Sequence, residues 1–524
     1  MPKSAVLCLV FAAALCAQPQ RQLGRIDFPT SGSAAAQSHF IQGVLLLHSF
    51  EYDDSREEFQ AASKIDPGFA MAYWGEALTY THPVWVEQNL QAARDALARL
   101  APTPAERIAK APTEREKDYL RAVEILYGEG GKVERDVAYA EAMGRMHEKY
   151  PDDLEAATLY AVALLGTCQH ERNYAVYMRA AAVVEEVFAK NPQHPGAAHY
   201  LIHAYDDPVH APLGLRAARV YAKIAGSASH AQHMPSHIFI ALGMWDDVVS
   251  SNIASVEVAD TRIARKGLTA DARNYHSLLW LEYGYLQEGR KADAHRVMEG
   301  VAQWAAQSGR TMSSLNLMRA FYALETGEPD RLAGNLDSSK GALIPASAML
   351  LAQGTLAVRQ GHLDEGRKLL AQFQAKLSAG TNGPADMQHT GMPMGAPAPA
   401  GAPQTPKEPE IMAQELEATL LQAEGKRDDA LRILTAAAAV EDGLSFEFGP
   451  PVPVKPTHEL IGEMLLAAGR PKEAKTEFER ALAKCPKRTI ALRGLAKAAE
   501  QSGDSLTAQR SLDDLKAFWH GGAL

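Results

Sequence analysis

Cysteine is scarce in this chain, with four residues in 524. Two of them, Cys8 and Cys16, fall in the first 17 residues, and the other two, Cys168 and Cys485, are far apart. This usage excludes a disulfide framework and a zinc site built on cysteine pairs. A glycine-rich phosphate loop and a nucleophile elbow are also missing, so we expect no nucleotide cofactor and no serine-hydrolase chemistry.

An excess of positive charge is missing as well. The chain has 53 basic and 63 acidic residues, which gives a formal net charge of -10. A nucleic-acid partner or an anionic membrane surface would need concentrated basic charge, so neither is expected. No internal stretch approaches the ~20 uninterrupted apolar residues of a membrane span.

The first residues are typical of a secretory signal. Lys3 precedes an apolar run from Ala5 to Leu15, and small residues follow at Cys16 and Ala17. We therefore expect a signal peptide over residues 1–17 and a periplasmic or secreted protein. Leu15 stands before Cys16, where lipoprotein signals have a small residue, so a lipid anchor is not expected.

One turn pattern recurs along the chain. It consists of a glycine, two polar or bulky residues, an acidic residue three or four positions after the glycine, and a small residue close to that acid. Each copy lies between two apolar stretches with helical spacing, so the glycine is expected to end one helix in the left-handed conformation before the next helix begins. The five glycines are Gly243, Gly289, Gly361, Gly425 and Gly469.

The last part of the chain has a period of 34 residues, because Gly462 and Gly469 are followed 34 positions later by Ala496 and Gly503. Pro486 separates the two units. This pattern resembles the tetratricopeptide repeat family. The resemblance implies an all-α fold, a right-handed superhelical solenoid of antiparallel helix pairs. It also implies a concave groove that binds a protein or peptide partner.

Composition divides the chain further. Residues 18–377 are predicted to form N-terminal and central repeats, and residues 411–524 the C-terminal repeats. Residues 378–410 are rich in glycine and proline and read as a disordered linker. Prolines at 450–456 exclude a helix there, and Phe446 and Phe448 are expected to pack this extended strap onto the solenoid.

Histidines concentrate in the middle of the chain. Seven of the 18 lie between His194 and His237, where an even spread would place about one or two. His199, His203 and Asp207 have the spacing of one helical stripe. Pro235 is suited to the first turn of a helix, which puts His237 on that helix and leaves His230 and His233 in the loop before it.

This pattern predicts one transition-metal site with the ligands His199, His203, Asp207, His233, His237 and His276, the last of which opens the next helix pair. Zinc, copper, iron and manganese are the candidate ions. A buried polar network and a site for an organic ligand are the alternatives. No glutamate follows His199, so the zinc-peptidase signature is absent.

A second string, Met387 to Met394, combines methionine with His389 inside the predicted linker and suits Cu(I). Trp85, after His82 and Pro83, is expected to fill a helix interface. Two functions follow. The first is an exported repeat scaffold with a histidine metal cluster on the groove side. The alternative is a metal-dependent enzyme or a copper-handling protein that uses the cluster from His199 to His237.

Overall fold

A computed structural model describes residues 21–168, 172–305, 311–329, 332, 342–378, 406–446 and 448–523. The expected signal peptide (1–17) and the interior of the expected linker, with Met387 to Met394, lie outside the described residues. None of the described helices is long and apolar enough to cross a membrane.

The N-terminal part is a series of helices whose starts are set by polar side chains. Asp153 and Asn173, for example, accept hydrogen bonds from the first backbone N–H groups of the helices that follow them. The helices are α1 (Ala34–His48), α2 (Tyr52–Ile65), α3 (Ala70–Leu78), α4 (Leu90–Ala98), α5 (Pro104–Lys110), α6 (Glu114–Leu126), α7 (Lys132–Lys149), α8 (Leu154–Gly166) and α9 (Tyr174–Lys190). A small hairpin between α3 and α4 holds β1 (Thr81–His82), the 3₁₀ turn η1 (Pro83–Trp85) and β2 (Glu87–Gln88), with β1 and β2 antiparallel.

The central part contains the histidine-rich block and the helix pairs after it. Its elements are α10 (Pro195–Ala204), α11 (Ala211–Ile224), α12 (Ser229–His233), α13 (Pro235–Ala241), α14 (Trp245–Lys266), η2 (Ala270–Ala272), α15 (Tyr275–Gln287), α16 (Lys291–Ala305), α17 (Met312–Thr326), α18 (Leu343–Arg359) and α19 (Leu363–Ser378).

The C-terminal part begins at Glu408, so the last residues of the predicted linker are already helical. Its helices are α20 (Glu408–Ala423), α21 (Arg427–Asp442), α22 (Thr457–Ala467), α23 (Pro471–Lys484), α24 (Thr489–Gln501) and α25 (Ser505–Lys516). α18 and α20 pack against each other, so the helical array continues across the predicted linker.

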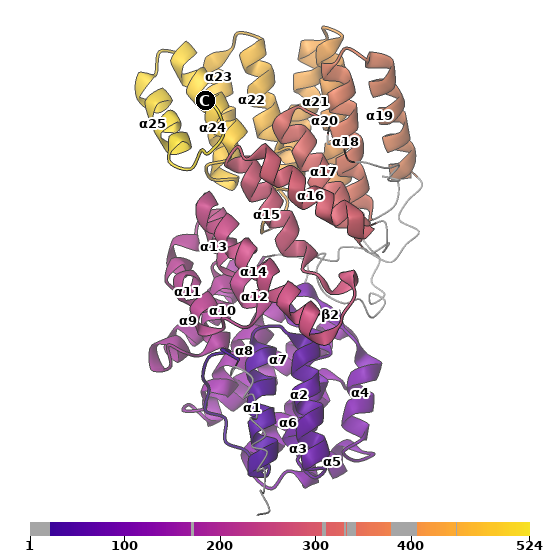
Figure 1. Cartoon of the computed structure of the whole chain (residues 1–524), viewed down its shortest axis with the longest axis vertical. Helices are drawn as coiled ribbons and strands as arrows, with labels where there is room; N and C mark the ends of the chain where they lie inside the picture. The colour runs from indigo at the N-terminus through magenta and orange to yellow at the C-terminus, as the bar shows by residue number, and fades with distance from the viewer. Residues whose placement is uncertain are drawn as a thin grey trace, which may run out of the picture.

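Helices that follow one another in the chain pack against each other. The N-terminal helices form the lower end of the molecule and α16 to α25 the upper end, with α19 and α25 on opposite sides of it (Figure 1). The five glycines of the recurring turn all have positive φ, between +64° and +82°. Each ends a helix in the left-handed conformation, as expected. The predicted all-α repeat fold is confirmed, and within the described residues only the β1–β2 hairpin departs from it.

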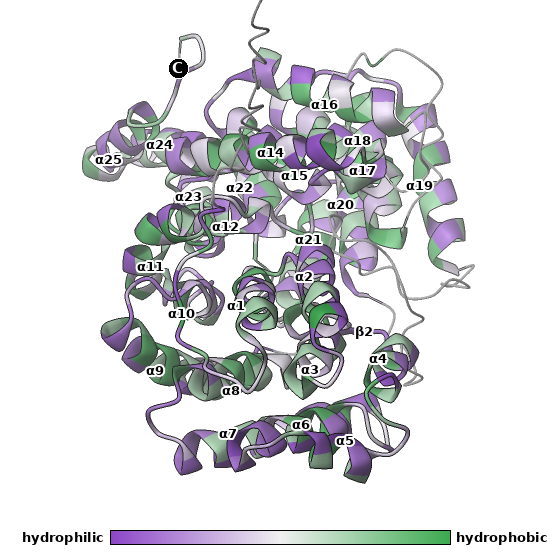
Figure 2. Cartoon of the chain, turned by 60° about the horizontal axis from the view of Figure 1, so that its bottom comes forward, coloured by the Kyte–Doolittle hydropathy of each residue, from purple (hydrophilic) through white to green (hydrophobic). Residues whose placement is uncertain are grey.

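Outer and inner helices differ in how much of their surface is buried. α16 and α19 bury one narrow stripe and carry both hydrophilic and hydrophobic residues (Figure 2). α8 and α15 are buried almost all round. Inner helices therefore contribute most of the core, and a polar side chain on them needs a partner inside the protein.

The C-terminal repeats pack against the centre of the chain as well as against each other. The buried guanidinium of Arg488 lies 2.8 Å from the carboxylate of Glu459 and donates a hydrogen bond of 2.7 Å to the hydroxyl of Tyr283 on α15. Trp245, at the start of α14, donates its indole N–H to the carbonyl of Lys487 at 3.0 Å. These contacts fix the C-terminal repeats relative to the helices that carry the histidines.

Within the C-terminal repeats, Phe478 of α23 is fully buried between two glycines of neighbouring helices. A Cβ atom at Gly462 or at Gly494 would overlap its ring. The small residues of the 34-residue pattern thus allow adjacent helices to approach closely.

We predict that Gly494→Ala destabilises the C-terminal repeats. Alanine should gain about 1 kcal/mol of helix propensity, but overpacking against Phe478 costs about 1–3 kcal/mol. Thermal unfolding of the full-length variant should therefore show a lower melting temperature. Gly522→Ala, at a site with open space around it, is the control. An unchanged transition for Gly494→Ala would contradict the packing described here.

Candidate metal centre

α10 is the helix that brings the first two histidines into the core. Pro195 occupies its first turn, and the helix packs against α1, α8, α9, α11 and α13. His199 and His203 lie one turn apart on it, and both are buried. Their imidazoles therefore point into the protein rather than into solvent.

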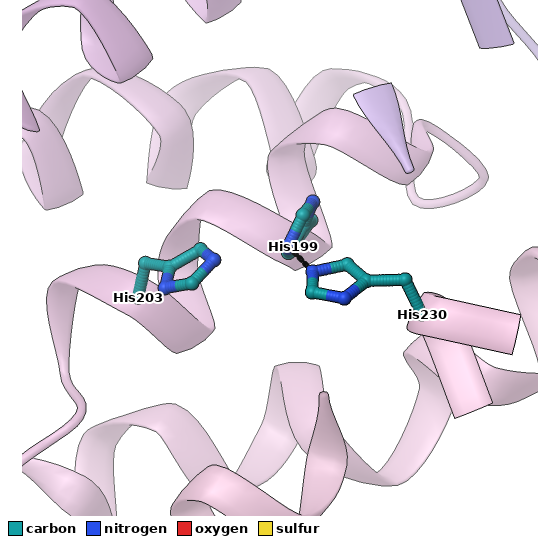
Figure 3. A group of neighbouring side chains, drawn as sticks. All are labelled: His199, His203 and His230. Carbon is teal, nitrogen blue, oxygen red and sulfur yellow. Dashed lines mark hydrogen bonds between the residues drawn. The ribbon is translucent and has the colours of Figure 1, made fainter. Parts of the chain in front are cut away.

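The first triad consists of His199, His203 and His230, and one ring nitrogen from each lies within 4.8 Å of those of the others. His230 comes from α12, and its Nε2 is 3.1 Å from Nε2 of His199 (Figure 3). The buried Nε2 of His203 has no hydrogen-bond partner among the described residues. An unpaired imidazole nitrogen in a core is costly unless something binds it.

The second triad consists of His233, His237 and His276, which come from α12, α13 and α15 and also offer ligand atoms within 4.8 Å of one another. Nε2 of His233 is 3.0 Å from Nε2 of His237. Their rings lie against the indole of Trp280, at centroid distances of 4.8 and 4.5 Å.

Oxygen acceptors from three other segments orient these rings. Nδ1 of His199 donates to the carbonyl of His48 at 2.6 Å, and Nδ1 of His237 donates to the carboxylate of Asp206 at 2.5 Å. Nδ1 of His233 donates to Oδ1 of Asn252 at 2.7 Å. In metal sites, a ligating histidine usually donates its second ring N–H to an oxygen in this way.

The Nε2 atoms of His233 and His237 face each other. Because Nδ1 of both rings donates to oxygen, Nε2 is the nitrogen that each ring presents to the other, at a distance of 3.0 Å. A proton on one of these nitrogens or a metal ion between them would pair the two. Two nitrogens that bind one tetrahedral ion through bonds of about 2.0–2.1 Å stand about 3.3–3.4 Å apart, close to the observed spacing.

Burial favours the neutral form of four of the six imidazoles. It lowers the pKa of His199 to about 3, and it holds the pKa values of His203, His230 and His233 well below the usual range, with the neighbouring histidines acting in the same direction. The neutral imidazole is the form that binds a metal ion.

The expected ligand Asp207 lies elsewhere. α10 ends at Ala204, shortly before Pro208, so Asp207 is not on the helical stripe with His199 and His203. Its carboxylate accepts from the backbone N–H of His210 at 3.0 Å and forms an ion pair with Arg172 at 3.3 Å. The structure therefore does not bring Asp207 to the histidine triads, and its neighbour Asp206 accepts the hydrogen bond of His237 instead.

The grouping of the histidines also differs from the single expected site. The structure divides the histidines into two triads and adds His230. His230 and His233 were expected in a loop, but Ser229–His233 forms the short helix α12. The prediction of Pro235 in the first turn of the helix carrying His237 is confirmed.

Aromatic rings surround the two triads. Phe50 packs on His199 with a centroid distance of 4.3 Å, and Trp85 of the hairpin contacts His230 at 5.5 Å. Phe448 of the proline-rich strap packs on His237 at 4.9 Å, as expected for that strap. His230 and His276 are half-buried, so solvent reaches the cluster at these two rings.

A separate buried cluster lies behind α10 and consists of His48, Glu155 and His194. Nε2 of His48 and of His194 donate to the two carboxylate oxygens of Glu155 at 2.7 and 3.0 Å. Burial would raise the pKa of Glu155, but the two histidines together outweigh it and hold that pKa well below its usual range. His48 Nδ1 lies 3.1 Å from the hydroxyl of Tyr200, and His194 Nδ1 accepts from the N–H of Ala197.

This cluster satisfies its own polar atoms and needs no metal. It also places the carbonyl of His48, which orients His199. His194 belongs to the histidine-rich block of the sequence, but no sequence pattern predicts a role for His48, Glu155 or Asn252. Their spacing in the sequence cannot show that these three residues lie near the histidines, because they come from the separate helices α1, α8 and α14.

Comparison with known proteins identifies the C-terminal repeats. Residues 457–513 match the family model described as Tetratricopeptide repeat. These residues are tetratricopeptide repeats. They cover α22 to α24 and most of α25, the region in which the 34-residue period is clearest. No curated protein matches the chain.

Solved structures of tetratricopeptide-repeat proteins resemble the chain only loosely. A monomeric mutant of IFIT1 with Gppp-AAAA is 12% identical, with 86% of this chain and 90% of that chain covered and a TM-score of 0.38. Yeast Tom70 is 10% identical, with coverage of 91% and 99% and a TM-score of 0.33. The Cut9–Hcn1 hetero-tetramer of APC/C is 14% identical, with 90% of this chain and 78% of that chain covered and a TM-score of 0.34. At these scores no function carries over to this chain.

The helix that supplies His276 and Trp280 also holds an unusual acid. Both carboxylate oxygens of Glu282 are buried without a hydrogen-bond partner among the described residues. Burial, and then the nearby Glu325, raise the pKa of Glu282 well above its usual range. The folded protein therefore keeps this carboxyl protonated at pH values where the unfolded chain has released the proton.

We predict that Glu282→Gln stabilises the protein increasingly as pH rises. The native state binds one more proton than the unfolded state above pH ~4.5, so the wild type loses up to about 1.4 kcal/mol of stability per pH unit until the native pKa is passed. Glutamine does not titrate. Urea unfolding at pH 5 and pH 8 should show the gap between variant and wild type widen. Glu500→Gln, at an exposed position, should show no such change. An equal gap at both pH values would mean that Glu282 is ionised in the fold.

Proposed function

We propose that this protein binds transition-metal ions through the six histidines His199, His203, His230, His233, His237 and His276. One observation supports the proposal above all: Nε2 of His233 and His237 face each other at 3.0 Å while Nδ1 of both rings donates to oxygen. The unpaired Nε2 of buried His203 points to the same conclusion in the first triad.

The donor set restricts the kind of ion. Six imidazoles and no carboxylate in the two triads suit zinc, copper or iron, and they disfavour the harder manganese, which prefers oxygen ligands. A catalytic role for the ions remains a prediction. The half-buried rings of His230 and His276 are the positions at which a substrate could approach.

Metal analysis tests this function directly. We expect untagged protein, purified from its native compartment, to carry zinc, copper or iron, or to take one of them up after removal of metal. The double variant His203→Ala/His276→Ala, which removes one ligand from each triad, should bind none while keeping its helical circular dichroism. His362→Ala changes an exposed histidine after α18 and should leave the metal content unchanged. Wild-type protein that stays metal-free after incubation with zinc, copper, iron and manganese would contradict the proposal.

We further propose a protein or peptide ligand for the concave face of the repeats. Tetratricopeptide repeats at 457–513 support a scaffold of this kind, since stacked helix pairs offer an extended binding surface. The partner would engage α22 and α24, the first helices of the two pairs.

We also propose that the protein is exported to the periplasm or secreted. The basis is the sequence of its start, where Lys3 precedes an apolar run from Ala5 to Leu15. Mass spectrometry of periplasmic or secreted material should give a mature N-terminus near Gln18. The cytosolic pool should contain little of the chain. Intact Met1 on a mainly cytosolic protein would contradict export.

A further inference from the structure

The two triads are covered by different segments of the chain. Trp85, in the 3₁₀ turn η1 of the β1–β2 hairpin, lies against the ring of His230, with 5.5 Å between ring centroids. Phe448 of the strap lies against His237 of the second triad. His230 and His276 are the half-buried members of their triads. The hairpin therefore covers the ring through which solvent reaches the first triad.

The base of the hairpin is firmly anchored. Nδ1 of His82 lies 2.9 Å from a carboxylate oxygen of Glu87 on the opposite strand. The side chain of Gln88 accepts a hydrogen bond of 2.6 Å from the buried guanidinium of Arg135 on α7. The ring of His82 also stacks on Tyr52 of α2, with 4.0 Å between centroids. These contacts fix the two strands to α2 and α7.

The tip of the hairpin, residues 83–86, is held by packing alone. None of its polar groups forms a hydrogen bond with another element within the described part of the chain. Pro83 packs on the end of α8, where a Cβ atom at Gly166 would lie 2.9 Å from it. Trp85 meets Phe50 edge-on, at a centroid distance of 5.1 Å. Movement of the tip away from the cluster therefore breaks apolar contacts but no hydrogen bond to another element.

Val86, the last residue of the tip, has a strained backbone. Its φ of +60° and ψ of +18° lie in the left-handed region, which a β-branched residue rarely adopts. Such a conformation persists only where the surrounding contacts hold it. Movement of the tip would release this strain. The strain therefore offsets part of the apolar packing that keeps Trp85 on His230.

We propose that the hairpin at residues 81–88 is a lid over the first triad, and that Trp85 is the side chain that closes it. The inference rests on the proposed metal-binding function and names the device that regulates access to that site. When the tip moves outward, His230 is open to solvent, and the unpaired Nε2 of His203 belongs to the same triad. An ion or ligand reaches the first triad only after the lid opens, whereas the second triad exchanges independently of it.

Chemical modification tests the lid without a metal. Metal-free full-length protein is treated with diethylpyrocarbonate, and the rate at each histidine is followed by peptide mass spectrometry. In the wild type, His230 should react more slowly than the exposed His362, because it waits for the lid to open. Trp85→Ala should accelerate the reaction of His230 by more than about tenfold, since the indole supplies much of the apolar contact of the tip. His276, half-buried in the second triad, should keep its rate.

A second variant separates a moving lid from a fixed wall. Val86→Asn keeps Trp85 but accepts the left-handed conformation more readily, so it should hold the tip closed and slow the reaction of His230 by about fivefold. Trp519→Ala removes a half-buried tryptophan that packs on Gly289, and it is the matched control. An unchanged rate at His230 in either hairpin variant would overturn the lid.

Metal release links the lid to the proposed function. Full-length protein loaded with zinc, or with copper or iron if zinc is not taken up, is mixed with an excess of chelator, and metal release is followed over time. We expect two phases, one from each triad. Trp85→Ala should accelerate one phase, and His203→Ala should remove that same phase. Acceleration of both phases or of neither would mean that the hairpin does not control the first triad. Wild-type protein that takes up no metal would contradict the proposed function, while the modification rates still decide whether the hairpin is a lid.

Discussion

The histidine cluster depends on the hydrogen bonds that Nδ1 of three buried imidazoles donates to oxygen. His48 supplies a carbonyl from the end of α1, Asn252 an amide oxygen from α14, and Asp206 a carboxylate from the turn after α10. Each bond fixes the tautomer and the angle of one ring, so that Nε2 points into the cluster. Without these three hydrogen bonds, each buried ring would turn toward whichever other polar group could pair its N–H.

These acceptors can be placed only because the repeat scaffold is rigid around them. α10 packs on both N-terminal and central helices, and the buried ion pair of Arg488 with Glu459 joins the C-terminal repeats to α15. The strap before α22 then passes over the cluster, where Phe448 covers His237. Segments from both ends of the chain thus complete the wall around the site.

Much of the fold was predictable because helical repeats depend on local signals. A glycine such as Gly469 takes the left-handed conformation at the end of a helix, and a small residue such as Gly462 allows the next helix to bring Phe478 close. Five of the six histidines that the triads bring together were also predicted from their clustering, and His230 was not. Asp207 was misplaced because α10 ends at Ala204, three residues before it, so the helical spacing from His203 no longer applies. The spacing alone cannot show where α10 ends. The acceptors Asn252 and His48 come from distant segments, whose register depends on packing.

The two buried histidine clusters of this chain form an internal comparison. In the cluster of His48, Glu155 and His194, all four ring nitrogens and both carboxylate oxygens have partners, which is how a structural network lowers the cost of buried polar groups. A few residues away, Nε2 of His203 has no partner among the described residues, and Nε2 of His233 lies against Nε2 of His237. The same core supports both arrangements, so the second is not a general failure of the scaffold to satisfy histidine. The proposed metal ions would give these nitrogens the partners that the described residues do not.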